Sequence, residues 1–282
     1  THAGITTMTR YFGKDRGKAI SLGNLGGMIG VMFLPVLVVF LKNHFTFREI
    51  WLFSSISLII FLPILFFILN NQNERQKKFK ESIEGNFKQW KTIEVIRNKI
   101  FLIYLPITTV FSFVGTGLMF HQIFIFSQKG WTLEMLGTGF IFLGFFSIIG
   151  LLLGGPLIDI LNPRKAILFL LLPIFIAIII LIFFNSYFFL LIYMSLYGFN
   201  LGISSPFTGS LWAEIFGLES LGTVKALFHA IVVLASAISP VIFGYIIDWG
   251  FGIGMISFIS LFMIILATIL PFTININEQS NT

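Results

Sequence analysis

The chain has 282 residues, of which 56% are hydrophobic and 11% are charged, and its mean hydropathy is +0.95. Soluble domains carry about 25% charged residues, so this composition excludes an ordinary water-soluble fold and predicts a protein embedded in lipid. The absence of cysteine excludes disulfides and thiolate metal sites.

Eight apolar runs are long enough to span a bilayer, which takes about 20 mostly apolar residues. They are residues 20–41, 50–70, 100–126, 133–158, 166–184, 187–212, 223–247 and 250–273. The fifth and sixth share one uncharged run, which Asn185 and Ser186 should split in a tight helix–helix turn. An even number of spans puts both ends of this chain on one side. The sequence therefore predicts an all-α, polytopic membrane protein with eight transmembrane helices.

The basic residues orient these spans. Fifteen of the 18 Lys and Arg residues fall on one side of the predicted topology. Three fall on the other side: Lys42, Arg48 and Lys129. By the positive-inside rule the rich side is cytoplasmic, which places both termini of this chain in the cytoplasm and the protein in a cell membrane. The net charge of +6 is thus a topology signal, and we expect no nucleic-acid partner.

The polar segment 71–99 divides the chain. Residues 1–70 hold two spans, residues 71–99 form a cytoplasmic linker, and residues 100–282 hold six spans. Four apolar residues recur at helical spacing between lysines of the linker: Phe79, Ile83, Phe87 and Trp90. This pattern favours a helix lying in the lipid headgroup region, although a simple tether with snorkelling lysines explains it equally well.

Three stretches resemble the major facilitator superfamily. RYFGKDRGKAISLGNLGGMIGVMFLPVL (residues 10–37) is similar to the loop and start of its fifth helix, and GPLIDILNPRKAIL (residues 155–168) to its Gly-x-Leu-x-Asp loop motif. Residues 211–250 resemble the tenth-to-eleventh helix region of bacterial monocarboxylate-type permeases. The loop motif departs from the pattern at Ile160, where an Arg is usual. The resemblance implies helices five to twelve of twelve, an N-terminally truncated chain, and a fold of inverted three-helix repeats.

An internal similarity agrees with such repeats. GPLID (residues 155–159) ends the fourth span and GYIID (residues 244–248) ends the seventh. These spans cross the membrane in opposite directions, and they occupy equivalent places if spans three to five match spans six to eight. Coincidence is the alternative, because the shared pattern is short.

No enzyme motif occurs in the sequence, which has no His-Glu-x-x-His, no Gly-x-Ser-x-Gly and no phosphate-binding loop followed by Lys-Ser/Thr. We expect no catalytic residues, metal or cofactor. The resemblance implies a secondary active transporter that moves a small organic solute, with a monocarboxylate as the candidate, by alternating access and as a monomer in the bilayer. A non-transporting receptor or assembly subunit with the same fold is the alternative.

Polar side chains within spans indicate a substrate cavity, because polar groups that face lipid are costly. One face of the third span carries Tyr104, Thr108, Ser112, Gly115, Met119 and Gln122, and one face of the sixth carries Tyr193, Tyr197, Asn200, Ser204 and Thr208. We expect six residues to bind the substrate: Tyr104 and, near the bilayer midplane, Thr108, Ser112, Tyr197, Asn200 and Ser236. Hydrogen bonds between helices or to the residues' own backbone are the alternative. These faces carry no fixed Lys or Arg that would hold an anion.

Two histidines and three charged residues are further candidates. His121, near the outer mouth, and His229, in the inner leaflet, are candidates for proton coupling because histidine is the side chain suited to proton transfer, with a structural hydrogen bond as the alternative for each. Asp159, Arg16 and Arg164 are gating candidates. We expect Asp159 to face the start of the first span, near residues 17–20, with Arg16 close to it, because a carboxylate is stabilised at a helix N-terminus. The superfamily resemblance implies that this contact holds the cytoplasmic side shut.

Small residues also follow one face of the fourth span. They are Gly137, Gly144, Ser147 and Gly154. Small side chains let transmembrane helices approach closely, so this face predicts a tight contact with another span.

Overall fold

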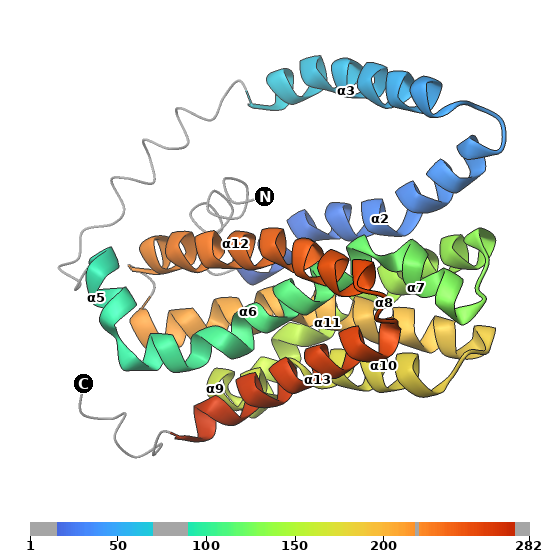
Figure 1. The fold of residues 1–282 in the computed structure, drawn as a ribbon. Coiled ribbons are helices and arrows are strands. Elements are labelled where there is room, and N and C mark those ends of the chain that lie inside the picture. Colours follow the sequence, from blue (N-terminus) through green and yellow to red (C-terminus); the bar gives the residue numbers. More distant parts are fainter. Residues whose placement is uncertain (1–15, 70–89, 218–219, 274–282) are drawn as a thin grey trace. The chain divides into compact units, whose positions relative to one another are not determined.

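The computed structural model describes residues 16–69, 90–217 and 220–273 (Figure 1). Within these ranges the secondary structure is helical, and eight helices are long and apolar enough to cross a membrane. The chain forms two compact units, residues 1–87 and residues 88–282. The all-α class and the eight predicted spans are therefore confirmed.

The first unit contains two long helices, α2 (Arg16–Lys42) and α3 (Phe47–Leu69), which match the first two predicted spans. A cap between them starts α3: the backbone N–H and the hydroxyl of Thr46 each donate to the Glu49 carboxylate at 2.8 Å. This bond satisfies a donor that the first helical turn leaves without an intrahelical acceptor.

The second unit contains the remaining six spans. Its elements are α5 (Thr92–Arg97), α6 (Lys99–Phe120), α7 (Gln122–Lys129), α8 (Leu133–Leu161), α9 (Pro163–Ala166), η2 (Ile167–Phe169), α10 (Leu172–Phe183), α11 (Tyr187–Phe216), α12 (Leu221–Asp248), α13 (Ile253–Ile269) and η3 (Leu270–Thr273). The helix expected around Phe79 to Phe87 lies outside the described residues. We call the end where α6 and α12 begin and α8 and α11 end the basic end of this unit.

Local chemistry explains several helix boundaries. The Asn98 side chain accepts from the backbone N–H groups of Ile100 and Phe101 at 2.9 and 3.1 Å and so starts α6. Gly130 ends α7 in the left-handed conformation, at φ 70°. As predicted, α10 and α11 are joined at Asn185 and Ser186. Two donors hold this turn, the ammonium of Lys129 at 2.7 Å from Asn185 Oδ1 and the indole of Trp131 at 2.6 Å from its carbonyl oxygen.

Helix packing in this unit is symmetric between its first three spans and its last three spans. α11 packs along α8, and α6 packs along α12, while α10 meets both α11 and α13. The repeat matches α6 with α11, α8 with α12, and α10 with α13. Under this matching the pair of α11 and α8 corresponds to the pair of α6 and α12. This is the packing expected of two three-helix repeats, and it agrees with the repeat inferred from GPLID and GYIID.

The contact between α8 and α11 is close enough to bring the two backbones together. A Cβ built on Gly202 would lie 2.7 Å from the backbone nitrogen of Leu151 and closer still to the carbonyl oxygen of Ser147. A Cβ on Gly154 would lie 2.5 Å from Pro206 Cγ. The small-residue face of the fourth span is thus in contact at Ser147 and Gly154, whereas Gly137 has open space beside it.

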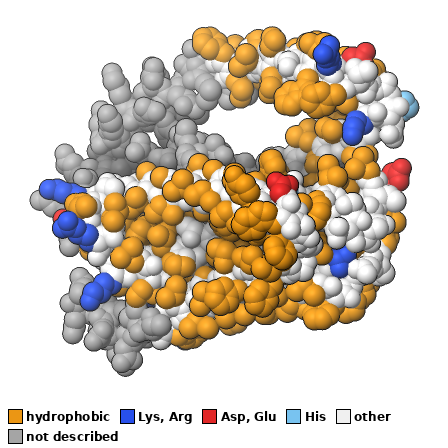
Figure 2. Space-filling view, viewed as in Figure 1, with side chains coloured by type: hydrophobic (Ala, Val, Ile, Leu, Met, Phe, Trp, Pro, Cys, Tyr) orange, Lys and Arg blue, Asp and Glu red, His pale blue; other side chains and the backbone are white. Residues whose placement is uncertain are grey.

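The outer surface is that of a membrane protein. Figure 2 shows hydrophobic side chains over most of the visible face, with the charged side chains mainly toward its ends. Large apolar side chains are exposed along the spans, among them Phe145, Phe183 and Phe258. Such a surface is stable only in contact with lipid or with further helices.

Candidate functional site

The polar faces of α6 and α11 meet near the middle of the membrane. Tyr197 is ten residues into α11, or about 15 Å along it, which is half of a hydrocarbon slab about 30 Å thick. Its hydroxyl lies 2.9 Å from the position of a Cβ on Gly115, and its ring packs against Phe111 with centroids 5.7 Å apart. We call this contact between Tyr197, Gly115 and Phe111 the α6–α11 seam.

The seam continues toward the end of the unit opposite the basic end. Tyr193 is fully buried, and its hydroxyl donates to Gln122 Oε1 at 3.4 Å. The amide of Gln122 points to the sulfur of Met194 at 3.9 Å. Tyr193 and Gln122 come from the two faces that the sequence analysis identified. Gln122 is the first residue of α7, so the repeating polar steps located a contact between α11 and the predicted third span, which the structure divides into α6 and α7.

Asn200 contacts α10 rather than α6. Its side chain is fully buried, and Oδ1 accepts from the backbone N–H of Ile174 at 3.3 Å, in the first turn of α10. That N–H has no acceptor within its own helix, so Asn200 caps α10 from outside. The amide nitrogen Nδ2 of Asn200 is buried without a hydrogen-bond partner among the described residues.

The hydroxyls predicted to bind substrate are bonded within the protein. Thr108 donates to the carbonyl oxygens of Tyr104 and Leu105 in its own helix, at 3.1 and 2.9 Å, and Ser236 donates to that of Val233 at 2.8 Å. The alternative of bonds to their own backbone therefore describes both. Each oxygen keeps lone pairs that can accept from a ligand.

The two other α6 residues differ in what they contact. The hydroxyl of Ser112 donates across to α12, to the carbonyl oxygen of Val232 at 3.3 Å. Tyr104 is buried, with 5% of its surface exposed, nearer the start of α6. Tyr104, Thr108 and Ser112 thus line α6 as expected, but Asn200 lies on the α10 side of α11, away from them.

His121 connects α6 to α12. It lies where α6 gives way to α7, and its Nε2 is 2.9 Å from the carbonyl oxygen of Pro240. A carbonyl only accepts, so Nε2 carries the proton in this bond. This bond fits the alternative stated for His121, which was a structural hydrogen bond. His229 is half-buried on α12, with its ring 5.3 Å from that of Phe228.

The gating candidates lie at the basic end or in the first unit. Asp159 is exposed in the last turn of α8. Arg164 lies in α9 and forms an ion pair with Glu214 of α11 at 3.0 Å. Arg16 is the first residue of α2, and its side chain lies outside the described residues. The contact between Asp159 and Arg16 stays a prediction.

Lys225 is a cationic residue that the sequence analysis counted only toward topology. It lies in the first turns of α12 and is half-buried, with Nζ 4.0 Å from the position of a Cβ on Gly209 of α11. It shares one face of α12 with His229 and Ser236, at steps of four and seven residues. The helical spacing that identified the polar faces of the third and sixth spans would also have placed Lys225 on this polar face of α12.

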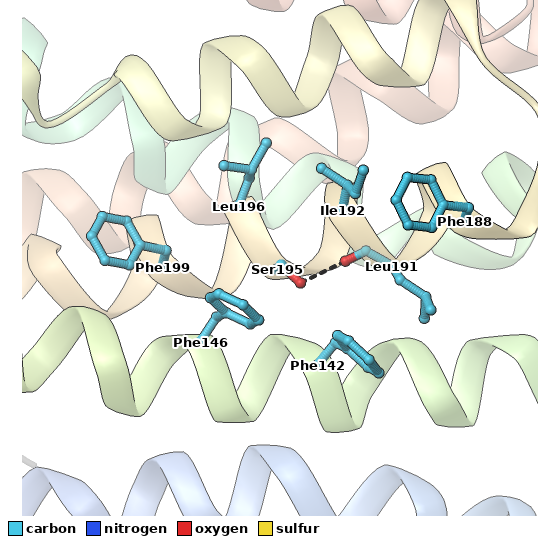
Figure 3. Close-up of a pocket in the computed structure, with 8 residues that line it drawn as sticks. All are labelled: Phe142, Phe146, Phe188, Leu191, Ile192, Ser195, Leu196 and Phe199. Atoms are coloured by element: carbon cyan, nitrogen blue, oxygen red, sulfur yellow. Dashed lines mark hydrogen bonds between the residues drawn. The ribbon is translucent and has the colours of Figure 1, made fainter.

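A groove of about 580 Å³ lies on another face of α11 (Figure 3). It is lined by Phe142 and Phe146 of α8 and by Phe188, Leu191, Ile192, Ser195, Leu196 and Phe199 of α11. Its polar residue, Ser195, donates its hydroxyl to the carbonyl oxygen of Leu191 at 2.7 Å. The lining is therefore apolar and suits hydrocarbon, and we assign no polar solute to it.

Comparison with known proteins gives one family. The comparison with curated proteins found no match. A family model described as Major Facilitator Superfamily matches residues 1–144 and, in an overlapping second match, residues 107–279. The two matches cover nearly the whole sequence, and the eight spans and the symmetric helix packing agree with them. The chain belongs to the Major Facilitator Superfamily.

Proposed function

We propose that this protein moves a small organic solute across a cell membrane by alternating access, with its substrate site at the α6–α11 seam. Membership of the superfamily makes it a multi-pass membrane protein of a transporter family, whose members are typically not enzymes. The resemblance of residues 211–250 to monocarboxylate-type permeases supports an organic acid as the solute. The distribution of basic residues supports an orientation with both ends of this chain in the cytoplasm. The resemblance to bacterial permeases supports the bacterial inner membrane as the location.

One observation carries the proposal: the hydroxyl of Tyr197 at mid-membrane depth. Tyr197 is 95% buried, and no hydrogen bond joins its hydroxyl to the described residues. The hydroxyl oxygen is not among the fully buried polar atoms, so it keeps accessible surface and is able to bond a partner. A solute in the seam would supply that partner, while the ring offers it a flat apolar surface. Gly115 lets α6 come close to this hydroxyl, because a Cβ there would lie 2.9 Å from the hydroxyl oxygen and 3.2 Å from the Phe111 ring.

The packing supports a rigid half that rocks as one body. α8 and α11 touch through their backbones, and α6 and α12 are joined by bonds from Ser112, His121 and Ser239. Superfamily carriers work by moving one bundle against the other around a site near the midplane. The conformational change would then leave the seam intact and alter only which side of the membrane reaches it.

Counterflow in proteoliposomes tests the proposal. The full chain is reconstituted, loaded with an unlabelled organic acid, and assayed for uptake of the labelled acid across a panel of monocarboxylates. Tyr197→Phe should slow uptake roughly 2–10-fold, which corresponds to one hydrogen bond of about 0.5–1.5 kcal/mol. Leu191→Ala, on the groove face of α11, is the matched control and should do less. The absence of counterflow for every solute would favour the receptor or assembly subunit instead.

Asn200→Ala tests the second buried polar group. The substitution removes the cap of α10 as well as the unpartnered Nδ2, so unfolding must be measured beside uptake. Loss of the cap should cost about 1 kcal/mol. A role in binding predicts a fall in uptake in protein that still inserts and folds; normal uptake would remove Asn200 from the site.

Proton coupling is assigned to His229 or His121 as a proposal. A pH gradient, acid outside, should drive wild-type uptake, and His229→Gln should abolish the gradient's effect while leaving counterflow in place. His121→Gln should instead lower stability, because His121 bonds the Pro240 carbonyl. Gradient-driven uptake that persists in both variants would exclude the two histidines.

A further inference from the structure

We propose that Lys225 is an anion-binding residue at the basic-end mouth of the transport path, where it selects solutes that carry a carboxylate or a similar anionic group. This inference rests on the proposed function and adds the substrate class to it. Lys225 is four residues beyond the start of α12, about 6 Å into the span. An ionisable side chain within a span is costly and is usually matched by a charged or polar partner.

No such partner occurs for Lys225 within the described part of the chain. The carboxylate of Glu214, at the same end of the unit, is already engaged by Arg164 at 3.0 Å. Within the described ranges, the ammonium of Lys225 takes part in no ion pair and no hydrogen bond. A half-buried positive charge without a fixed counter-charge is a site that an anion can enter and leave.

The space for that anion lies beside Gly209. The ammonium is the one described group within 4 Å of a Cβ position on Gly209, apart from the backbone of α11 itself, and it is 4.0 Å away. The neighbouring Ser205 is exposed one turn earlier on α11. A carboxylate oxygen in this space would contact the cation directly, with a hydroxyl in the same region.

The position also connects to the α6–α11 seam. Gly209 is twelve residues beyond Tyr197 on α11, which is about 18 Å along the helix. On α12, the face of Lys225 continues to Val232, whose carbonyl oxygen holds Ser112 of α6. A small solute cannot touch Tyr197 and Lys225 at once, so Lys225 acts at the mouth of the path. There it binds an anion that is about to enter the seam or one that has just left the seam. A cation in such a cleft raises the local concentration of anions and speeds their association.

An anionic group could come from a solute or from a lipid headgroup, and the test separates the two. The full chain is placed in nanodiscs of phosphatidylcholine, and thermal unfolding is followed with acetate, L-lactate, pyruvate or inorganic phosphate, and with lactamide as the uncharged counterpart of lactate. At least one anion should stabilise the wild type and lactamide should not. Lys225→Met should weaken the apparent Kd for that anion at least tenfold, because a hydrogen bond to a charged group is lost.

Two variants serve as controls. Lys225→Arg keeps the charge and should retain most of the effect, whereas Lys165→Met removes an exposed lysine at the same end and should change nothing. An equal response of the wild type and Lys225→Met, or no response of the wild type to any of these anions, overturns the proposal. So does stabilisation that requires phosphatidylglycerol in the nanodisc, since a lipid headgroup then occupies the site.

The unfolding assay measures anion binding and not transport, so it tests the role of Lys225 separately from the proposed carrier function. Anion binding through Lys225 without counterflow would leave an anion-binding receptor and reject the carrier. Unchanged counterflow of an anion by Lys225→Met would reject the role of Lys225 and leave the carrier in place.

Discussion

Substitution of Gly202 by Ala is the sharpest test of the fold, because it acts on one of the closest backbone contacts between α8 and α11. The added methyl carbon would lie 2.7 Å from the backbone nitrogen of Leu151 and nearer to the carbonyl oxygen of Ser147. Both atoms belong to the backbone of α8, so no rotation of a side chain can relieve the overlap. Ordinary contacts begin at 3.4 Å, so α8 and α11 must separate locally by about 0.7 Å or more.

Such a separation weakens the whole interface. A gap of about 0.5–1 Å removes a quarter to a half of the dispersion energy of each atom pair that faces it. Overpacking of this kind costs about 1–3 kcal/mol, and occasionally more. We expect the upper end, about 3 kcal/mol, even though Ala in place of Gly favours a helix by about 1 kcal/mol. Gly155→Ala in α8 is the matched control, because nothing lies within 4 Å of its Cβ position.

The measurement is thermal unfolding of the purified proteins in one detergent, at a fixed scan rate because such unfolding is seldom reversible. For a unit of this size, about 3 kcal/mol corresponds to a fall of roughly 6–12 °C in the midpoint. Gly155→Ala should melt at or slightly above the wild-type midpoint. If Gly202→Ala melts within a degree of Gly155→Ala, the backbone contact between α8 and α11 does not exist as described.

Three further predictions concern the basic end, the topology and the α6–α12 contact. Arg164→Ala should cost about 1 kcal/mol in unfolding measurements, and a double-mutant cycle with Glu214→Gln should give a coupling energy of 0.2–1 kcal/mol; zero coupling would make the ion pair irrelevant to stability. In this cysteine-free chain, a cysteine at Asn43 should react with an impermeant maleimide from outside, and a cysteine at Gln76 should not, unless the proposed orientation is wrong. Ser239→Ala removes a hydrogen bond to the Phe113 carbonyl and should lower stability by about 1 kcal/mol in a chemical or thermal melt, with an unchanged midpoint counting against the bond.

The spans were predictable because lipid imposes a simple requirement of length and apolar composition. The turn at Asn185 and Ser186 followed from the same logic, since polar residues interrupt an apolar run there. Breaks within spans were missed. The fifth span is divided into α9, η2 and α10, and Pro163 and Pro173 stand in the first turns of α9 and α10. Proline lacks the N–H that would continue a helix, but apolar composition alone does not show where the chain restarts.

The candidate site was predictable only in part, because the spacing of polar residues identifies one face of a helix but not the neighbouring helix that covers it. Tyr197 and Asn200 are three residues apart, which turns them by about 60° around α11. That angle is enough to direct Tyr197 to α6 and Asn200 to α10. Lys225 was counted only among the basic residues that orient the spans, because it lies near the start of a span. Its position beside Gly209 depends on how α12 packs against α11, which no local pattern encodes.

The symmetric helix packing determines when this unit can assemble during synthesis. α6 ends at Phe120, but its partner α12 begins only at Leu221, about 100 residues later. At a translation rate of about 5–20 residues per second, α6 waits roughly 5–20 s in the membrane before its partner leaves the ribosome. α8 waits a shorter time for α11, which begins at Tyr187. During that interval Ser112, on the polar face of α6, must be shielded from lipid by the insertion machinery, so the nascent chain depends most on that machinery before its last two spans emerge.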